Sequence, residues 1–249
     1  MLPLTQHRAA RLEALQAEDG WLNLTDRVEL TPGPQSAGSA PDNQIQISTG
    51  PAHLGLINPS AQTLTPPNAA PISFQPAPGG FPQLRTETLL LELHTVDGTP
   101  ALRVRDLTLP RQTTLHYFPT NEALIVRASW QALPTPIQQP IDQKGGAPTT
   151  VNLTHTAHFT HDGHAITLLA THWKDNKPMF VIRDQTSGRE TYPASRFLIG
   201  EDANETEITL DFNRAFTPPC GFTDFAICPL PPRENILPFR VEAGERLTP

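Results

Sequence analysis

The sequence has few cysteines, few aromatic residues and no long apolar run. Two cysteines among 249 residues build no disulfide framework and are typical of a reducing compartment. No segment approaches the roughly 18–20 apolar residues that cross a membrane as a helix, and the N-terminus carries no apolar signal segment. We therefore expect a cytoplasmic protein with no membrane partner.

Basic residues are also in short supply. Lysine and arginine total 18 against 25 acidic residues, which gives a net charge of −7. Nucleic-acid affinity arises mainly from neutralised phosphates, so this balance excludes a general nucleic-acid binder. The composition gives no indication of the oligomeric state.

Proline, by contrast, is abundant, with 28 residues spread between strand-like runs. Runs of alternating apolar and polar residues between Gly and Pro turns predict a mainly β fold, an antiparallel β-sandwich or a distorted barrel. The one helix that we expect covers Thr5–Asp19 and ends at Gly20. We expect a single domain over residues 1–249, with an N-terminal helix and anchor in 1–24, a β body in 25–212 and an ordered proline-rich tail in 213–249.

One hairpin is specified residue by residue. The pair Asp162-Gly163 is a strong two-residue turn signal, and it predicts that His161 pairs with His164. Counting back along both strands, Phe159 faces Ile166 on the apolar side.

A polar stretch earlier in the chain, Leu133–Pro148, carries four prolines and two adjacent glycines. This composition predicts a long loop or a boundary between two halves of the body.

The histidines at positions 155, 158, 161 and 164 suggest a metal site, because imidazole is a common ligand. On a strand, however, this spacing divides the rings between two faces, so at most His161 and His164 share one ion. Two ligands without a third do not make a site. We predict no metal and no cofactor.

The most informative segment is Asp211–Asn235, which holds both cysteines and five prolines. The prolines exclude a helix and the aromatic residues need apolar cover, so the segment predicts a long ordered loop. Ordered loops of this length are usually functional or act as structural staples. Cys220 and Cys228 fit neither redox nor zinc spacing. That leaves buried free thiols, a late-formed disulfide or one catalytic thiol.

Polar residues cluster before and inside this segment. Glu190, Tyr192 and Arg196 follow a turn, and they form either a ligand-binding cluster or a buried ion pair with a hydroxyl group.

At the two ends of the proline-rich loop stand two further polar pairs. Asn213 and Arg214 occupy the end of a predicted strand, and Glu234 and Asn235 close the loop. These side chains either grip an anionic ligand or anchor the carbonyl groups of the loop.

The run DFNRAFTPPCGFTDFAICPLPPREN, the following LPFRVEAGER and the earlier RDQTSGRETYPASRFL resemble the C-terminal signature of a family of uncharacterised bacterial and archaeal proteins, a domain of unknown function. Weaker similarities of GSAPDNQIQI with PAHLG and of RVRD…HYFP extend the resemblance to about residues 21–245. It implies kinship without an activity. The residues that it points to are Arg105, Asp106, Gly188, Glu190, Tyr192, Arg196, Asn213, Arg214, Cys220, Cys228, Glu234 and Asn235.

A second, fainter resemblance concerns the stretch GSAPDNQIQIS…PAHLG, which is similar to the core of forkhead-associated phosphopeptide modules. Those modules use an arginine after the glycine and a serine before the histidine. This chain has Ser39 and Pro51-Ala52 at those places, so the side chains that grip phosphate are missing. The resemblance implies a related sandwich without phosphothreonine recognition.

Three functions remain open from the sequence. The first is a polar site for an anionic small molecule, with hydrolase-type catalysis by Glu190 as base, Tyr192 as acid and Arg214 as anion clamp. The predicted ligand-binding residues of this site are Arg105, Arg196, Asn213, Cys220, Glu234 and Asn235. The second is a sandwich-type protein-interaction module that uses its loops. The third treats the signature as a structural staple. Whether the chain is an enzyme is left open.

Overall fold

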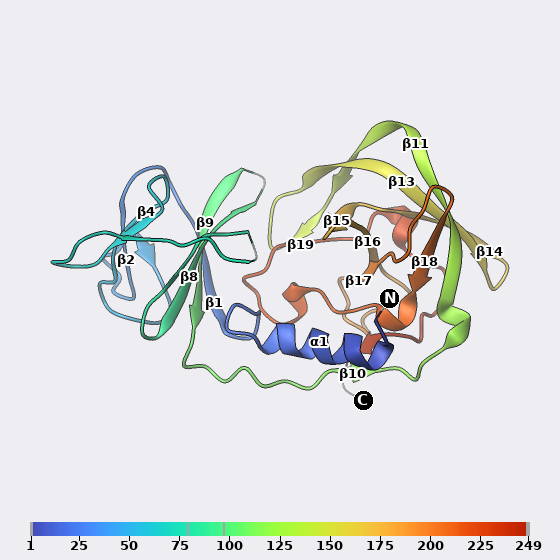
Figure 1. Ribbon diagram of the computed structural model, residues 1–249, viewed down its shortest axis with the longest axis horizontal. Coiled ribbons are helices and arrows are strands. Elements are labelled where there is room, and N and C mark those ends of the chain that lie inside the picture. Colours follow the sequence, from blue (N-terminus) through green and yellow to red (C-terminus); the bar gives the residue numbers. More distant parts are fainter. Residues whose placement is uncertain (1, 79, 97, 248–249) are drawn as a thin grey trace. The chain divides into compact units, whose positions relative to one another are not determined.

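The computed structural model describes residues 2–78, 80–96 and 98–247. Strands dominate, and α1 (Leu4–Gln16) is the one α-helix among the described residues (Figure 1). The predicted mainly β fold with an N-terminal helix is therefore confirmed. Within the described ranges, no helix is long and apolar enough to cross a membrane.

The chain divides into two compact units. Unit 1 comprises residues 1–12 and 114–249, and unit 2 comprises residues 13–113. Each unit has its own cluster of buried apolar side chains. The prediction of a single domain over residues 1–249 stays a prediction.

Helix α1 ends three residues before the predicted Asp19, and Gly20 follows a short turn. The Gly20 amide donates to the Ala17 carbonyl at 3.0 Å. A Cβ at position 20 would lie only 2.5 Å from the Leu15 carbonyl oxygen. Glycine is therefore the residue that lets the chain pass this close to the last helical turn.

In the part of unit 2 that the structure describes there are two sheets, in the orders β1-β9-β8-β7 and β3-β2-β4-β5-β6. All pairs are antiparallel except β2 with β3. Ile45, Ile57, Leu91 and Leu102 are among the side chains of its buried core. The strands are β1 (Leu24–Glu29), β2 (Gln35–Gly38), β3 (Ile45–Gln46), β4 (Gly55–Asn58), β5 (Thr63–Thr65), β6 (Ile72–Ser73), β7 (Gln83–Arg85), β8 (Leu89–Val96) and β9 (Thr99–Asp106).

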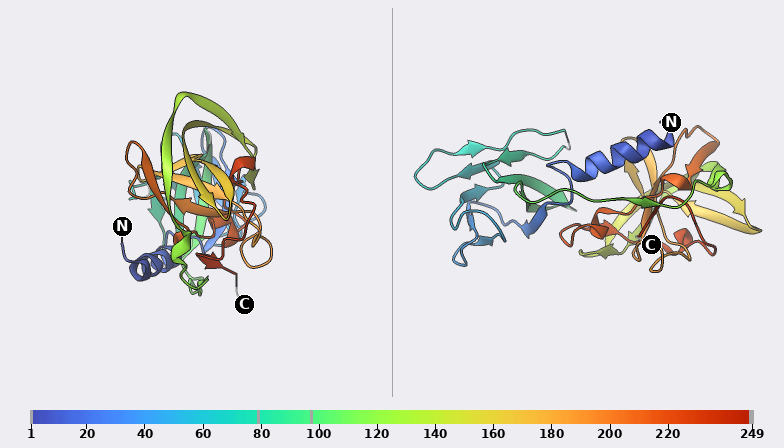
Figure 2. Two further views of the ribbon diagram at one scale, coloured as in Figure 1. Left: turned by 90° about the vertical axis from the view of Figure 1, so that its right-hand side faces the viewer. Right: turned by 90° about the horizontal axis from the view of Figure 1, so that it is seen from below.

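Unit 1 is built on the antiparallel sheet β14-β13-β11-β18 and the smaller sheet β15-β16-β17, with the short pairs β10-β20 and β12-β19 (Figures 1 and 2). Trp130, Leu168, Phe180 and Phe212 belong to its buried core. The strands are β10 (His116–Tyr117), β11 (Ile125–Ile141), β12 (Gln143–Lys144), β13 (Thr149–His161), β14 (His164–Leu169), β15 (His172–Lys174), β16 (Lys177–Ile182), β17 (Arg196–Ile199), β18 (Glu207–Asp211), β19 (Cys228–Pro229) and β20 (Glu245–Arg246).

The predicted hairpin between β13 and β14 is confirmed. His161 pairs with His164 and Phe159 with Ile166. Asp162 and Gly163 both have positive φ, 48° and 76°, as a two-residue hairpin turn of this kind requires. The register is the one that the turn residues predicted.

The expectation of a long loop over Leu133–Pro148 is wrong, because β11 continues to Ile141 and β12 follows at once. The pairing of β11 with β13 has an irregularity between Ala132 and Ile137, where two of the prolines fall. The pairing of β11 with β18 stops at Ser129, so the later part of β11 is hydrogen-bonded through β13 alone. Prolines are tolerated at such irregular and edge positions.

The C-terminal segment is ordered, as predicted from its prolines and aromatic residues. It contains three single turns of 3-10 helix, η2 (Phe212–Arg214), η3 (Pro219–Gly221) and η4 (Arg233–Asn235). Cys220 is buried in η3 and Asn235 in η4. The segment thus packs its short turns onto unit 1.

Candidate functional site

A hollow of about 520 Å³ lies in unit 1, within the range of about 300–1,000 Å³ that is common for ligand pockets. Three parts of the chain form it: the segment around β12, the end of β16 with the following turn, and the proline-rich loop. Its lining residues are Asp142, Lys144, Arg183, Tyr192, Pro193, Ala194, Leu230, Pro231 and Ile236.

One wall of the hollow carries a closed set of hydrogen bonds, which we call the Lys144–Tyr192 latch. The Lys144 ammonium donates to the Tyr192 hydroxyl at 2.5 Å and to the Cys220 carbonyl at 3.1 Å. The Tyr192 hydroxyl donates to the same Cys220 carbonyl at 2.6 Å. The bond to Tyr192 raises the pKa of Lys144, and burial raises the pKa of Tyr192. Both groups therefore stay protonated at neutral pH.

Two free thiols lie next to the latch. Cys220 and Cys228 are buried, and the Cys220 amide donates to the Cys228 sulfur at 3.3 Å. A hydrogen bond from the Cys228 thiol lowers the pKa of Cys220 to about 7, and the same bond raises the pKa of Cys228. A thiolate on Cys220 is therefore accessible near neutral pH.

Arg183 supplies a second cation at the hollow. It directly follows β16, its side chain is exposed, and none of the described residues forms a hydrogen bond or ion pair with its guanidinium. Its backbone is held on both sides: its amide donates to the Asn235 carbonyl at 3.1 Å, and its carbonyl accepts from the Leu237 amide at 2.7 Å. The hollow thus presents a guanidinium on a rigid strand end with its donors unused.

Asn235 holds the end of β16, where Arg183 lies, through hydrogen bonds to neighbouring backbone groups. The side chain is fully buried and its amide donates to the carbonyls of Leu169 and Val181 at 3.0 and 2.9 Å, while its oxygen accepts from the Leu169 amide at 2.8 Å. Asn235 therefore joins β14 and β16 to the proline-rich loop. The neighbouring Glu234 is exposed.

Arg196 lies in a buried ion pair and not at the hollow. Its guanidinium donates to Asp184 at 2.7 Å and to the carbonyls of Val241 and Ala243 at 2.9 and 2.5 Å. Arg196 is 1% exposed, so these partners leave no face for a ligand. The sequence allowed either a ligand-binding cluster or a buried ion pair in this region. For Arg196, the structure has the buried ion pair.

Asn213 and Arg214 anchor the loop start in the same manner. Asn213 exchanges hydrogen bonds with the backbone of Asn121, accepting at 2.8 Å and donating at 2.9 Å. The Arg214 guanidinium donates to Asp211 at 2.8 Å and to the Leu2 carbonyl. Both side chains are buried.

Glu190 and Arg105 also lie apart from the hollow. The Glu190 carboxylate is half-buried and accepts from Arg240 at 2.5 Å. Arg105 belongs to unit 2, where it is buried and donates to the Gly20 carbonyl at 2.9 Å and to Glu92 at 3.3 Å.

Of the nine predicted site residues, only Tyr192 lines the hollow, and Cys220 joins it through the latch. The sequence reasoning missed Lys144 and Arg183. The chain has three lysines in all, and this rarity is the one sequence signal that marks Lys144 as a candidate site residue. Arg183 is the first residue of the RDQTSGRE segment, but only the fold brings it to the same hollow as Lys144.

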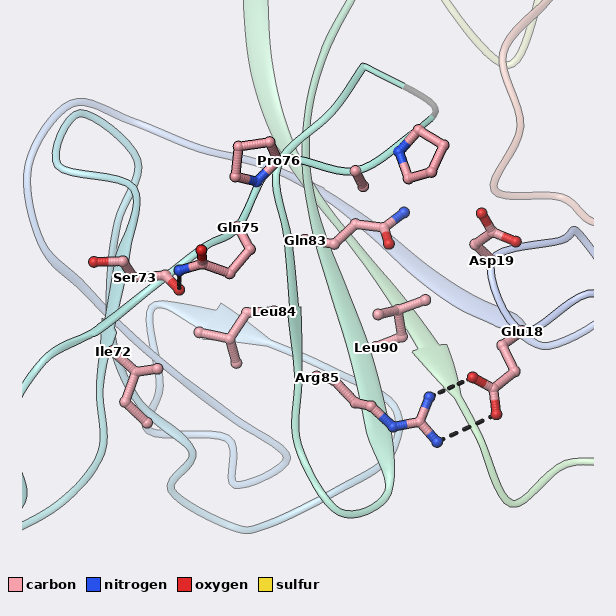
Figure 3. A pocket seen from close by; sticks show the side chains of 12 residues that line it. Glu18, Asp19, Ile72, Ser73, Gln75, Pro76, Gln83, Leu84, Arg85 and Leu90 are labelled. Atoms are coloured by element: carbon pink, nitrogen blue, oxygen red, sulfur yellow. Dashed lines mark hydrogen bonds and ion pairs between the residues drawn. The ribbon is translucent and has the colours of Figure 1, made fainter.

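Unit 2 has hollows of its own. One, of about 590 Å³, is lined in part by Ile72, Leu90 and Pro76 (Figure 3). Its Arg85 guanidinium is joined to the Glu18 carboxylate through both terminal nitrogens, so the charge is already neutralised. This hollow is less suited to a charged ligand than the one in unit 1.

The forkhead-associated-like stretch surrounds a smaller hollow of about 380 Å³. Its Asn43 amide donates to the backbone carbonyls of Ala40 and Ala52, both at 2.8 Å. Asn43 therefore holds the loop together. Protein interaction through these loops stays a prediction.

The family model described as "Protein of unknown function (DUF1684)" matches residues 111–246, which is more than half of the chain. The chain belongs to the DUF1684 family. The expected membership of a family of unknown function is thereby confirmed, and the detailed C-terminal signature stays a prediction. The DUF1684 match covers the hollow, the latch and both cysteines.

The DUF1684 chain is also similar to an uncharacterised protein of Haloarcula marismortui whose structure was solved in solution by NMR. The identity is 31%, the match covers 53% of this chain and 76% of the other, and the TM-score is 0.45. No curated protein matches the sequence.

Proposed function

We propose that this DUF1684 protein binds a small anionic molecule in the hollow of unit 1, with Arg183 and Lys144 as anion contacts and Tyr192 beside them. One observation carries the proposal. The Arg183 guanidinium lines a concave site together with a second cation, and no described residue uses its donors. Guanidinium groups bind carboxylate and phosphate oxygens in pairs, which gives geometry as well as attraction.

The rest of the lining supports an organic anion more than a bare inorganic ion. Pro193, Leu230, Pro231 and Ile236 offer apolar surface beside the two cations. Pockets for small molecules commonly combine such apolar walls with a few convergent polar groups.

The charge balance of the lining narrows the ligand class. Asp142 is exposed and opposes one of the two cations, so the hollow has one net positive charge. This favours a monoanion with an apolar body, such as a monocarboxylate, over a highly charged metabolite.

Hydrolase-type catalysis receives less support than binding. Glu190, Tyr192 and Arg214 have separate partners, which are Arg240, Lys144 and Asp211 respectively. A base, an acid and an anion clamp must converge on one reacting bond. We therefore propose binding as the function and keep the catalytic roles as predictions.

A thermal-shift screen of monocarboxylates and phosphate monoesters tests the proposal. A ligand at about 100 times its Kd stabilises the folded chain by roughly 2.7 kcal/mol. The stabilisation is expected in the wild type, absent in Arg183→Ala and retained in Arg127→Ala, which removes an exposed arginine on β11 away from the hollow. A ligand that stabilises Arg183→Ala as strongly as the wild type contradicts the proposed site.

A further inference from the structure

Cys220 and Cys228 are placed as a reacting pair, and binding at the hollow does not use them. The Cys220 amide donates a hydrogen bond to the Cys228 sulfur at 3.3 Å, which places the two residues side by side. They are 4% and 2% exposed. Both thiols are free in this structure, so the two sulfurs must draw closer to reach the S–S bond length of about 2.05 Å.

Both cysteines are tied directly to the latch. The Cys220 carbonyl is the common acceptor of Lys144 and Tyr192. Cys228 is the backbone partner of Lys144 in the pair β12-β19. A backbone shift that brings the two sulfurs together is therefore transmitted to the Cys220 carbonyl, to the backbone of Lys144, or to both.

We propose that Cys220 and Cys228 form a reversible disulfide that releases the Lys144–Tyr192 latch and strengthens anion binding in the hollow. The last step, the gain in anion affinity, rests on the proposed function. The disulfide and the change at the latch do not.

The oxidant that we name is a peroxide. The Cys220 thiolate attacks one peroxide oxygen, the O–O bond breaks, and the products are a sulfenic acid on Cys220 and one water. The Cys228 thiol then attacks the Cys220 sulfur, the S–O bond breaks, and the oxygen leaves as a second water. Two sulfurs lose two electrons in total, and hydrogen peroxide is reduced to two waters. An external dithiol reverses the reaction by thiol–disulfide exchange.

The order of these two steps follows from the surroundings. Cys220 is the thiol that ionises near neutral pH, helped by the Cys228 hydrogen bond and the positive charge of Lys144. Besides Cys220, the carboxylate of Asp224 also raises the pKa of Lys144 by charge attraction. Cys220 is therefore the first thiol to react, and Cys228 resolves the sulfenic acid.

The direction of the effect on binding follows from charge. A Cys220 thiolate partly neutralises Lys144, and the disulfide carries no charge. Oxidation thus leaves the Lys144 ammonium free to attract an anion, and it removes the repulsion between that anion and the thiolate.

The first test uses the intact purified chain and hydrogen peroxide. We expect the mass to fall by two hydrogen atoms, both free thiols to disappear and a dithiol to restore them. In Cys228→Ser we expect a sulfenic acid that dimedone traps on Cys220, and in Cys220→Ser no such adduct on Cys228. Two thiols that persist under peroxide, or a disulfide that forms only between two chains, would overturn the proposal.

The second test reads the latch without any ligand. The chain has two tyrosines, so a sample with ¹³C at the tyrosine Cζ gives one signal for Tyr192 and one for Tyr117, which serves as an internal control. On oxidation the Tyr192 signal is expected to shift and its titration to change, while the Tyr117 signal stays in place. A disulfide that leaves the Tyr192 signal unchanged overturns the release of the latch.

The third test measures binding of benzoate, a monocarboxylate with an apolar body, to both redox states. Roughly threefold or tighter binding is expected in the oxidised chain, from the loss of one nearby negative charge. Equal or weaker binding after oxidation overturns the affinity step. Absence of benzoate binding in both states counts against the proposed function, and the mass and tyrosine readouts still decide the disulfide and the latch.

Discussion

The Tyr192 hydroxyl donates a 2.6 Å hydrogen bond to the Cys220 carbonyl, and this bond joins the turn after β16 to the proline-rich loop. Tyr192→Phe removes the bond and leaves the Cys220 carbonyl with Lys144 alone. We expect a loss of about 0.5–1.5 kcal/mol in the free energy of unfolding, measured with urea. Tyr117→Phe is the matched control, because the buried Tyr117 hydroxyl has no hydrogen-bond partner among the described residues. A Tyr192→Phe variant as stable as Tyr117→Phe would show that the latch does not stabilise the fold.

The buried pair Arg196–Asp184 predicts a large loss of stability. Arg196→Ala leaves the Asp184 carboxylate unpaired in the core, and removing one partner of a buried pair costs about 3–5 kcal/mol. The exposed pair Arg127–Glu207 provides the control, and Arg127→Ala is expected to cost less than about 1 kcal/mol. Urea unfolding of both variants measures the difference. Equal costs would contradict a structural role for Arg196.

Asn235 and Glu234 are neighbours in the chain, but the Asn235 side chain is buried and hydrogen-bonded, whereas the Glu234 side chain is exposed. Asn235→Ala removes three hydrogen bonds and leaves buried backbone groups of Leu169 and Val181 unpaired. A loss of about 2–4 kcal/mol is expected, because each buried unsatisfied group costs about 1–3 kcal/mol. Glu234→Ala changes an exposed side chain and should stay within about 0.5 kcal/mol of the wild type. Thermal melting of the two variants side by side checks this prediction, which fails if the order is reversed.

His94 makes unit 2 sensitive to acid. Burial, together with the charge of Arg103, lowers the pKa of this histidine from 6.5 to about 4. The unfolded chain therefore takes up a proton near pH 6.5 that the native chain takes up only near pH 4. The contribution to stability is complete above pH 6.5 and is lost as the pH falls toward 4, by up to about 3 kcal/mol.

The measurement is the free energy of unfolding at several pH values for the wild type and His94→Gln. The variant is expected to lose most of this slope between pH 6.5 and 4, whatever its absolute stability. His53→Gln changes an exposed histidine of the same unit and should keep the slope. An unchanged slope in His94→Gln would assign the acid sensitivity to other groups. Two separate unfolding transitions in these curves would also contradict the predicted single domain over residues 1–249.

The sequence predicted those features that short segments determine by themselves. The Asp162-Gly163 turn fixed the register of β13 and β14, and the prolines of Asp211–Asn235 indicated an ordered loop that is not a helix. The helix α1 followed from the same kind of local signal, although it ends at Gln16, before the predicted Asp19.

Features that depend on distant contacts were not predictable in the same way. The prolines of Leu133–Pro148 suggested a loop, but pairing with β13 keeps most of that stretch extended. Arg196 and Arg214 are charged residues in a signature and resemble ligand contacts, whereas their partners Asp184 and Asp211 make them structural. Lys144 and Arg183 meet only because β12 and β16 end at the same hollow.

Calorimetric titration of benzoate into the reduced wild type, Arg183→Ala and Arg127→Ala tests the central claim most directly. The account predicts saturable one-to-one binding to the wild type and to Arg127→Ala. It predicts binding at least about tenfold weaker in Arg183→Ala, the equivalent of losing one charge-assisted hydrogen-bonded contact. Equal binding to Arg183→Ala and Arg127→Ala, or no binding to the wild type, would contradict an anion site at this hollow.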